Sequence, residues 1–216
     1  MTRAPSVSPP LHRCCRLAMS LSATVLLSAC SILPSQTPMD TYVLPAPVTQ
    51  QTPASAGANT GLALRITRPL VDGAIAGRRI VVMPQAGRIS VYQGAIWSEP
   101  PAQLLRNRLI DAFQADSRLS SISTDEGVMP HADYLLATQL RAFHSAYENG
   151  HPHAVIRLDA QIIRASNNRI VASHSFQTQQ SASGKSVPEV VQALGKASDR
   201  LSQDVVDWTI LQIRTP

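Results

Sequence analysis

The chain has 216 residues, of which 15% are charged, with 19 basic and 14 acidic side chains. This length suits one folded domain with additional segments, and its three cysteines, two of them adjacent, cannot form a disulfide framework or a C-x-x-C metal site. The first 29 residues hold three arginines and no acidic residue, so the remainder has a net charge of only +2 (16 − 14). That balance gives no support for nucleic-acid binding.

Residues 1–29 have the three-part layout of an export signal. Three arginines precede an apolar run over residues 17–27, and two small residues end that run directly before Cys30. The run is about half the roughly 20 apolar residues that a transmembrane helix needs. The stretch 27–30 is similar to a lipobox, and it predicts removal of residues 1–29 and lipid modification of Cys30. The alternative is a buried core cysteine that follows a chance apolar run.

The residue after Cys30 bears on location. An aspartate there is the usual inner-membrane retention signal in enteric bacteria, whereas this chain has Ser31. We therefore expect a lipid-anchored protein of the outer membrane that faces the periplasm, held to the membrane through Cys30.

Residues 30–61 are expected to form a lipidated tether. They are rich in Pro, Gln, Thr, Ser and Ala, and Asp40 is their only charged residue, so they cannot bury enough apolar surface to fold alone. Residues 41–44 have strand character and could pair with the edge of the following domain. That domain is predicted to span residues 62–216.

The first half of this domain reads as three strands and a helix. The strands are expected at 62–68, 79–83 and 88–92, and Pro100 and Pro101 mark a helix start, because proline is tolerated in the first turn. The helix should run to about residue 116. Three apolar residues spaced four positions apart define its buried face: Leu105, Leu109 and Phe113.

The second half has clearer periodicity. Alternating apolar residues predict strands around 134–142, 156–162 and 170–176, with a turn at Asn167 and Asn168 between the last two. The third strand should bury Ile170, Ala172 and Phe176 on one face. Ser186 and Glu189 form a capping box before a long helix, whose apolar stripe comprises Val187, Val190, Leu194, Leu201, Val205 and Trp208. The fold class is α+β, a mostly antiparallel sheet with two helices packed on one face.

The sequence contains no recognisable catalytic signature, and we predict no catalytic residue, metal or cofactor. His151 and His153 flank a proline and could hold a metal, but a third ligand at suitable spacing is missing. Asp133, His131 and Ser145 are the residue types of a catalytic triad, but the sequence gives no geometric support for one.

Five arginines gather in the expected first three strands: Arg65, Arg68, Arg78, Arg79 and Arg88. They could face acidic lipid headgroups or an acidic partner. The alternative, which we favour, is that they protect exposed strand edges by charge.

Tyr92 and Trp97 lie close together at the junction between the third strand and the first helix, and they are two of only nine aromatic residues. Tryptophan and tyrosine dominate interaction hot spots, so this segment is a candidate partner interface. The alternative is that Trp97 packs the helix onto the sheet, in which case its loss would reduce stability.

The order of these features resembles the ABC-type transport auxiliary lipoprotein family, which includes the paraquat-inducible protein C lipoproteins. The resembling features are the lipobox, Tyr42-Val43-Leu44, Tyr92-x4-Trp97-x2-Pro100, Ala132-Asp133-Tyr134-Leu135-Leu136 and the final strands and helix. Tyr42 and Leu44 thereby join Tyr92 and Trp97 as candidate interface residues.

The resemblance implies a non-enzymatic auxiliary subunit that works with an ABC transporter and docks to a mammalian-cell-entry (MCE) domain protein. Such systems move phospholipids or other hydrophobic molecules between two membranes. A lipoprotein that regulates a periplasmic cell-wall enzyme is the main alternative, and a hydrolase is a third, disfavoured class. The transported lipid, its direction and the oligomeric state stay open, self-association included.

Overall fold

The computed structural model describes residues 38–47, 59–126 and 130–214. The expected export signal and Cys30 therefore lie outside the described residues. The chain divides into two units, Met1–Pro38 and Met39–Pro216, and the description below concerns the second.

The longest strand, β7 (Tyr134–Glu148), organises a sheet that has nine strands among the described residues. One edge of β7 pairs antiparallel with β8 (His151–Arg164) along its length, and β8 pairs antiparallel with β9 (Arg169–Ser181). Asn149 and Gly150 join β7 to β8 with φ angles of 50° and 75°. Two successive positive φ angles characterise the type I′ turn of tight hairpins.

The other edge of β7 pairs with three separate strands, all parallel to it. In order along β7 they are β2 (Ala63–Ile66), β3 (Leu70–Val71) and β4 (Arg79–Gln85). A short 3₁₀ helix, η2 (Gly73–Ile75), lies between β3 and β4. The sheet is completed by β6 (Ser121–Thr124), parallel to β2, by β5 (Arg88–Trp97), antiparallel to β4, and by β1 (Asp40–Tyr42), parallel to β5.

The α+β class is confirmed, but the expectation of a mostly antiparallel sheet is wrong, because the sheet is mixed. Parallel pairing joins β1 to β5, β2 to β6, and each of β2, β3 and β4 to β7. Antiparallel neighbours can be joined by short hairpins. Parallel pairs instead join segments that are distant in sequence, and the local apolar period contains no information about that choice.

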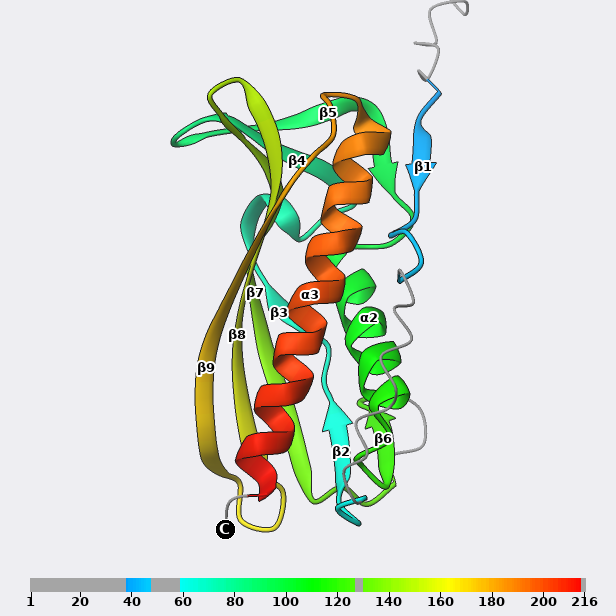
Figure 1. Ribbon diagram of the computed structural model, residues 1–216, viewed down its shortest axis with the longest axis vertical. Helices are drawn as coiled ribbons and strands as arrows, with labels where there is room; N and C mark the ends of the chain where they lie inside the picture. The colour runs from blue at the N-terminus through cyan, green and yellow to red at the C-terminus, as the bar shows by residue number, and fades with distance from the viewer. Residues whose placement is uncertain (1–37, 48–58, 127–129, 215–216) are drawn as a thin grey trace, which may run out of the picture. The chain divides into compact units, whose positions relative to one another are not determined.

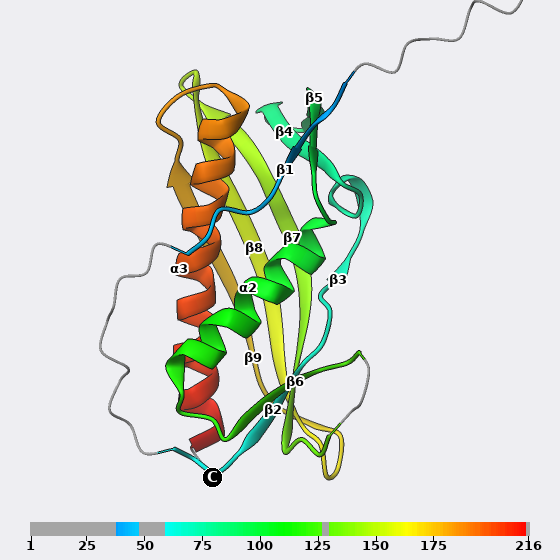
Figure 2. The ribbon, with the colours of Figure 1, turned by 90° about the vertical axis from the view of Figure 1, so that its right-hand side faces the viewer.

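Two helices complete the fold: α2 (Pro101–Asp116) and α3 (Val187–Arg214). The sheet curls around them, with α3 packed on β7, β8 and β9 and α2 packed beside α3 (Figures 1 and 2). The predicted start of α2 at the proline pair is confirmed. The Glu189 half of the predicted capping box is also present, because the Ser186 backbone N–H donates to Glu189 Oε2 at 3.0 Å. This bond and that from the Ser186 hydroxyl hold the pKa of Glu189 below its usual range.

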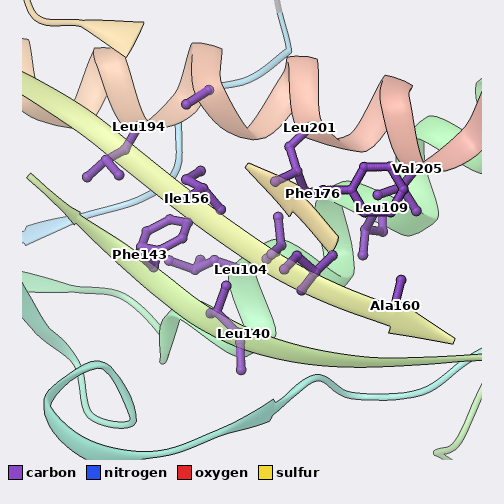
Figure 3. Packing of buried hydrophobic residues seen from close by; sticks show 14 of the residues in the cluster. Leu104, Leu109, Leu140, Phe143, Ile156, Ala160, Phe176, Leu194, Leu201 and Val205 are labelled. Atoms are coloured by element: carbon purple, nitrogen blue, oxygen red, sulfur yellow. The ribbon is translucent and has the colours of Figure 1, made fainter. Parts of the chain in front are cut away.

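The core lies between the helices and the inner face of the sheet (Figure 3). On α3 four residues of the predicted stripe are buried, and Leu201 and Val205 have no exposed surface. The residues at the two ends of that stripe are partly buried and pack against the core: Val187 and Trp208. The two fully buried residues belong to one cluster with Phe143 and Ile156 of the sheet, and Figure 3 shows Phe176 of β9 beside them. Burying one such side chain contributes roughly 1.5–3 kcal/mol, so this layer dominates the stability of the domain.

A β-bulge near the beginning of β9 changes which side chains face inward. Ile163 pairs with Ile170 while Ile162 pairs with Ala172, so Val171 is an extra residue in β9. The prediction that Ile170 shares the buried face of Ala172 is therefore wrong, and Ile170 is 55% exposed. A bulge of one residue reverses the alternation beyond it.

Candidate anchoring and docking surfaces

The segment that precedes the domain is fastened to it. Residues 39–45, called the strap here, begin with β1, which pairs with the last residues of β5. The Ser98 backbone N–H donates to the Tyr42 carbonyl oxygen at 2.7 Å. Tyr42 and Leu44 are partly buried and pack against the core. Two of the candidate interface residues thus hold the strap on the domain.

A buried arginine joins the strap to both helices. Arg108 of α2 is 6% exposed, and its guanidinium donates to the Pro45 carbonyl oxygen and to the Asp199 carboxylate of α3. Pro45 also contacts α3 directly, because a Cβ added at Gly195 would lie 3.0 Å from Pro45 Cδ. The strap can therefore approach the α3 backbone only because residue 195 has no side chain.

Trp97 is a core residue. It has no exposed surface and forms an edge contact with Phe143, with ring centroids 5.8 Å apart. Its carbonyl oxygen accepts a hydrogen bond from Arg78 Nε at 2.8 Å. In the folded domain Trp97 has no surface to offer a partner, so the packing alternative describes its position.

Tyr92 is also directed into the domain. Its hydroxyl lies 3.3 Å from Oγ of Ser145, a residue with no exposed surface. Burial of the phenol raises the pKa of Tyr92 to about 12, which the hydrogen bond to Ser145 partly opposes. Its partly exposed side chain retains some surface, but its polar group already has an internal partner.

A surface that we did not predict lies on the outer face of β7, β8 and β9. Leu135, Ile163 and Ile170 pair with one another across the three strands, and Val171 lies beside them. Val171 is 39% exposed, and Leu135 and Ile163 are partly exposed. We call these four residues the outer patch. Its only sequence signal is the adjacent apolar pair at 170 and 171, which interrupts the alternation.

The five arginines do not form one basic surface. Arg65 donates to the Pro130 carbonyl oxygen, Arg68 pairs with Glu126, and Arg78 bonds Trp97 as described. Arg79 and Arg88 are exposed. Within the described residues, neither of these two side chains forms a hydrogen bond or an ion pair.

An additional buried arginine was missed. Arg106 is 3% exposed and pairs with Asp125 and Glu126 after β6. These two hydrogen-bonded carboxylates raise the pKa of its guanidinium. Arg106 and Arg108 thus fasten two separate chain segments to α2, a role that a pattern of apolar residues cannot show.

The residues considered for catalysis or metal binding are not brought together. His131 lies 3.5 Å from Asp133, but Ser145 is 12 residues further along the same extended region (145 − 133), roughly 40 Å away at strand spacing. His151 and His153 line a shallow hollow of about 150 Å³ with Glu148. No group of three metal-ligand residues occurs in the part of the chain that the structure describes.

Among residues 38–47, 59–126 and 130–214, no helix is long and apolar enough to cross a bilayer.

Comparison with known proteins supplies the remaining information. The sequence profile of the ABC-type transport auxiliary lipoprotein component matches residues 42–206, so the matched region begins inside β1 and includes most of the strap. The uncharacterized protein bll6063 of Bradyrhizobium diazoefficiens is 26% identical over 166 residues, which are 76% of this chain and 44% of that protein. The chain therefore spans less than half the length of this relative.

Two crystal structures share the fold. The Xanthomonas campestris protein XCC0632 superimposes with a TM-score of 0.73 and 27% identity, covering 81% of this chain and 97% of that one. An uncharacterized protein superimposes with a TM-score of 0.62 and 16% identity, covering 80% and 99%. The second likeness shows the fold alone.

Proposed function

The chain belongs to the ABC-type transport auxiliary lipoprotein family, and we propose that it is the membrane-anchored, non-enzymatic docking subunit of such a transporter. The family match carries this proposal. It associates the protein with ABC transport and with a lipid anchor, and the strap supports this by fastening the segment nearest to Cys30 to the domain.

The proposed anchor is Cys30, and the strap gives it a mechanical role. Only nine peptide steps separate Cys30 from Met39 (39 − 30). The strap is held by the β1–β5 pairing and by Arg108 at Pro45. Tension on the lipid anchor would therefore be distributed to the sheet and to both helices rather than to a flexible terminus.

The finer parts of the proposal concern location and partner. We propose that the protein is in the outer membrane and faces the periplasm, because Ser31 follows the cysteine, and that it docks to an MCE-domain protein of the same system. Such a partner would approach from the opposite membrane. It would therefore meet the part of the domain that lies away from the anchor.

We therefore propose that the outer patch is the docking surface. The patch adjoins the β8–β9 turn, at the end of the domain opposite to the start of β1 (Figure 1). Ile170 and Val171 are among the exposed large apolar residues, whereas Trp97 is buried and Tyr42 and Leu44 hold the strap. Exposed apolar groups of this kind commonly mark interaction sites.

The test is capture of the partner from detergent-solubilised membranes, with proteins identified by mass spectrometry. Wild-type protein should capture an MCE-domain protein, and Ile170→Lys combined with Val171→Lys should weaken capture by about 2 kcal/mol or more, as expected for hot-spot residues. Leu70→Lys is the matched control, since Leu70 is 71% exposed and lies on β3, outside the outer patch. Equal capture by both variants would exclude the outer patch, and absence of any MCE protein would contradict the docking role.

The non-enzymatic part of the proposal has its own test. The purified protein should not hydrolyse esters, phosphates or glycans, and a chelator should not lower its melting temperature. A chelator-induced decrease would identify a structural metal and would direct attention to His151 and His153.

A further inference from the structure

The direction of β1 shows which end of the domain receives the tether. Because β1 runs parallel to β5, its N-terminal end points toward the side from which β5 comes, which is the β4–β5 turn. Figures 1 and 2 show the start of β1, the β4–β5 hairpin, the β7–β8 turn and the start of α3 at one end of the domain. We call this the tether end, and the end with the β8–β9 turn the far end.

The length of the tether keeps the tether end close to the membrane. This step depends on the proposed lipidation of Cys30. The nine peptide steps from Cys30 to Met39 span at most roughly 32 Å even when fully extended. The 28 residues of α3 extend for roughly 42 Å from the tether end to the far end. Surfaces at the tether end are therefore always within reach of the bilayer that holds the anchor.

The β4–β5 hairpin presents suitable chemistry at that end. Ile89 is 60% exposed, and its neighbour Arg88 is exposed at the turn. From Gly73 to Ser98 the sequence contains three arginines and no acidic residue. An exposed aliphatic side chain beside a cation suits the interface of a bilayer with anionic lipid, where the apolar group enters the acyl boundary and the cation meets phosphate.

The acidic residues of the tether end lie on other elements. Asp40 lies on β1, Glu148 belongs to the end of β7, and Glu189 is bonded to Ser186 in the first turn of α3. The hairpin tip therefore combines exposed apolar surface with positive charge and has no carboxylate of its own.

We propose that the tip of the β4–β5 hairpin is a second membrane contact, with Ile89 inserted into the lipid surface and Arg88 against anionic headgroups of the bilayer that holds Cys30. Two contacts on one side of the domain restrict its rotation about the tether. The far end, with the outer patch, then points away from that bilayer. A single flexible anchor could not set this orientation.

The experiment uses the full lipidated protein in vesicles of phosphatidylcholine with or without phosphatidylglycerol. Cys14 and Cys15 lie in the expected signal, and lipidation blocks the thiol of Cys30, so Ile89→Cys gives one site for an environment-sensitive dye. Ile170→Cys at the outer patch is the matched control, being similarly exposed at 55%. The dye at residue 89 should brighten, shift to shorter wavelength and be quenched by lipid-attached quenchers, while the dye at residue 170 should not.

The role of charge is measured on the same preparation. Arg88→Gln should remove most of the difference between the two vesicle compositions, since one arginine near an anionic surface changes binding roughly fivefold. Equal dye signals at residues 89 and 170, or a water-exposed dye at residue 89, would overturn the second contact. Flotation of the protein with the vesicles separates the two proposals: protein that fails to float contradicts the anchor, whereas protein that floats with residue 89 in water contradicts only the hairpin contact.

Discussion

The two ends of the domain use apolar residues in opposite ways. At the tether end Trp97 is fully buried, and Tyr42 and Leu44 hold the strap on the core. At the far end a bulge turns Ile170 outward, although its position in the sequence resembles that of a core residue. The comparison teaches that the aromatic content of a segment does not identify an interface. Whether a side chain already has an internal partner decides the question.

The physical basis of the difference is the way each end is closed. The tether end is closed by chain segments that cross one another, with Arg108 joining the strap to α2 and α3. The far end closes through the β8–β9 turn, whose strands keep their hydrogen bonds and leave one face open. Mutations at each end can test this contrast.

The first prediction compares one apolar residue from each end. Trp97→Ala should lower the free energy of unfolding by about 3–5 kcal/mol, because it removes a buried indole and its contact with Phe143. Ile170→Ala should change it by no more than about 0.5 kcal/mol, since most of that side chain is exposed. Urea unfolding followed by circular dichroism measures both. A large loss for Ile170→Ala would mean that the outer patch belongs to the core.

The second prediction concerns Arg108, the arginine that fastens the strap. Arg108→Met should cost about 1–3 kcal/mol, because it removes the hydrogen bonds that the guanidinium donates to the Pro45 carbonyl and to Asp199. Arg141→Met, which breaks an exposed pair with Asp159, should cost no more than about 1 kcal/mol. Only the first variant should be cleaved faster by chymotrypsin at Tyr42. Equal cleavage of the two variants would show that Arg108 does not hold the strap.

The sequence was sufficient for the elements that depend on local patterns. The proline pair located the start of α2, and Ser186 with Glu189 located the start of α3, because caps act within a few residues. Alternation also identified the strands that became β7 and β8. In each case the relevant contacts join residues that are close in sequence or follow a fixed period.

The remainder depends on contacts between distant segments. The parallel pairing of β2 and β4 with β7 joins residues more than 60 positions apart (145 − 82 = 63), and no local signal selects it. Arg108 could not be recognised as buried, since its partners are a backbone carbonyl and a residue of α3. One extra residue, Val171, was enough to invert the predicted orientation of Ile170.

The third prediction tests the contact between the strap and α3. Alanine is favoured over glycine inside a helix by about 1 kcal/mol, but at position 195 its Cβ would lie 3.0 Å from Pro45 Cδ. Gly195→Ala should therefore leave stability within about 1 kcal/mol of wild type while chymotrypsin cleaves faster at Tyr42. Lys196→Ala, at the exposed neighbouring position, should not affect cleavage. A stabilised variant with unchanged cleavage would show that Pro45 accommodates the methyl group.

The fourth prediction, with the smallest effect, concerns the loss of stability at acidic pH. His144 lies on β7 opposite Val155, in the half nearer the tether end. Burial lowers the pKa of His144 below 6.5, and the nearby charges of His153 and Arg157 lower it further. The folded state thus favours neutral histidine. The contribution is fully present above pH 6.5 and is lost as the pH falls through the lowered pKa, because the unfolded chain then binds the proton more readily.

His144→Gln should therefore reduce the loss of stability between about pH 7 and pH 5, because the variant has no proton to gain at this position. Hydrogen exchange can locate the effect. On acidification the amides around the His144–Val155 pair should exchange faster relative to those around the Leu136–Ile162 pair, which lies near the far end of the same two strands. In His144→Gln that difference should shrink. If acid accelerates exchange equally at both pairs in wild type, the two halves of β7 respond to protons as one unit, and the distinction between the ends is limited to their apolar surfaces.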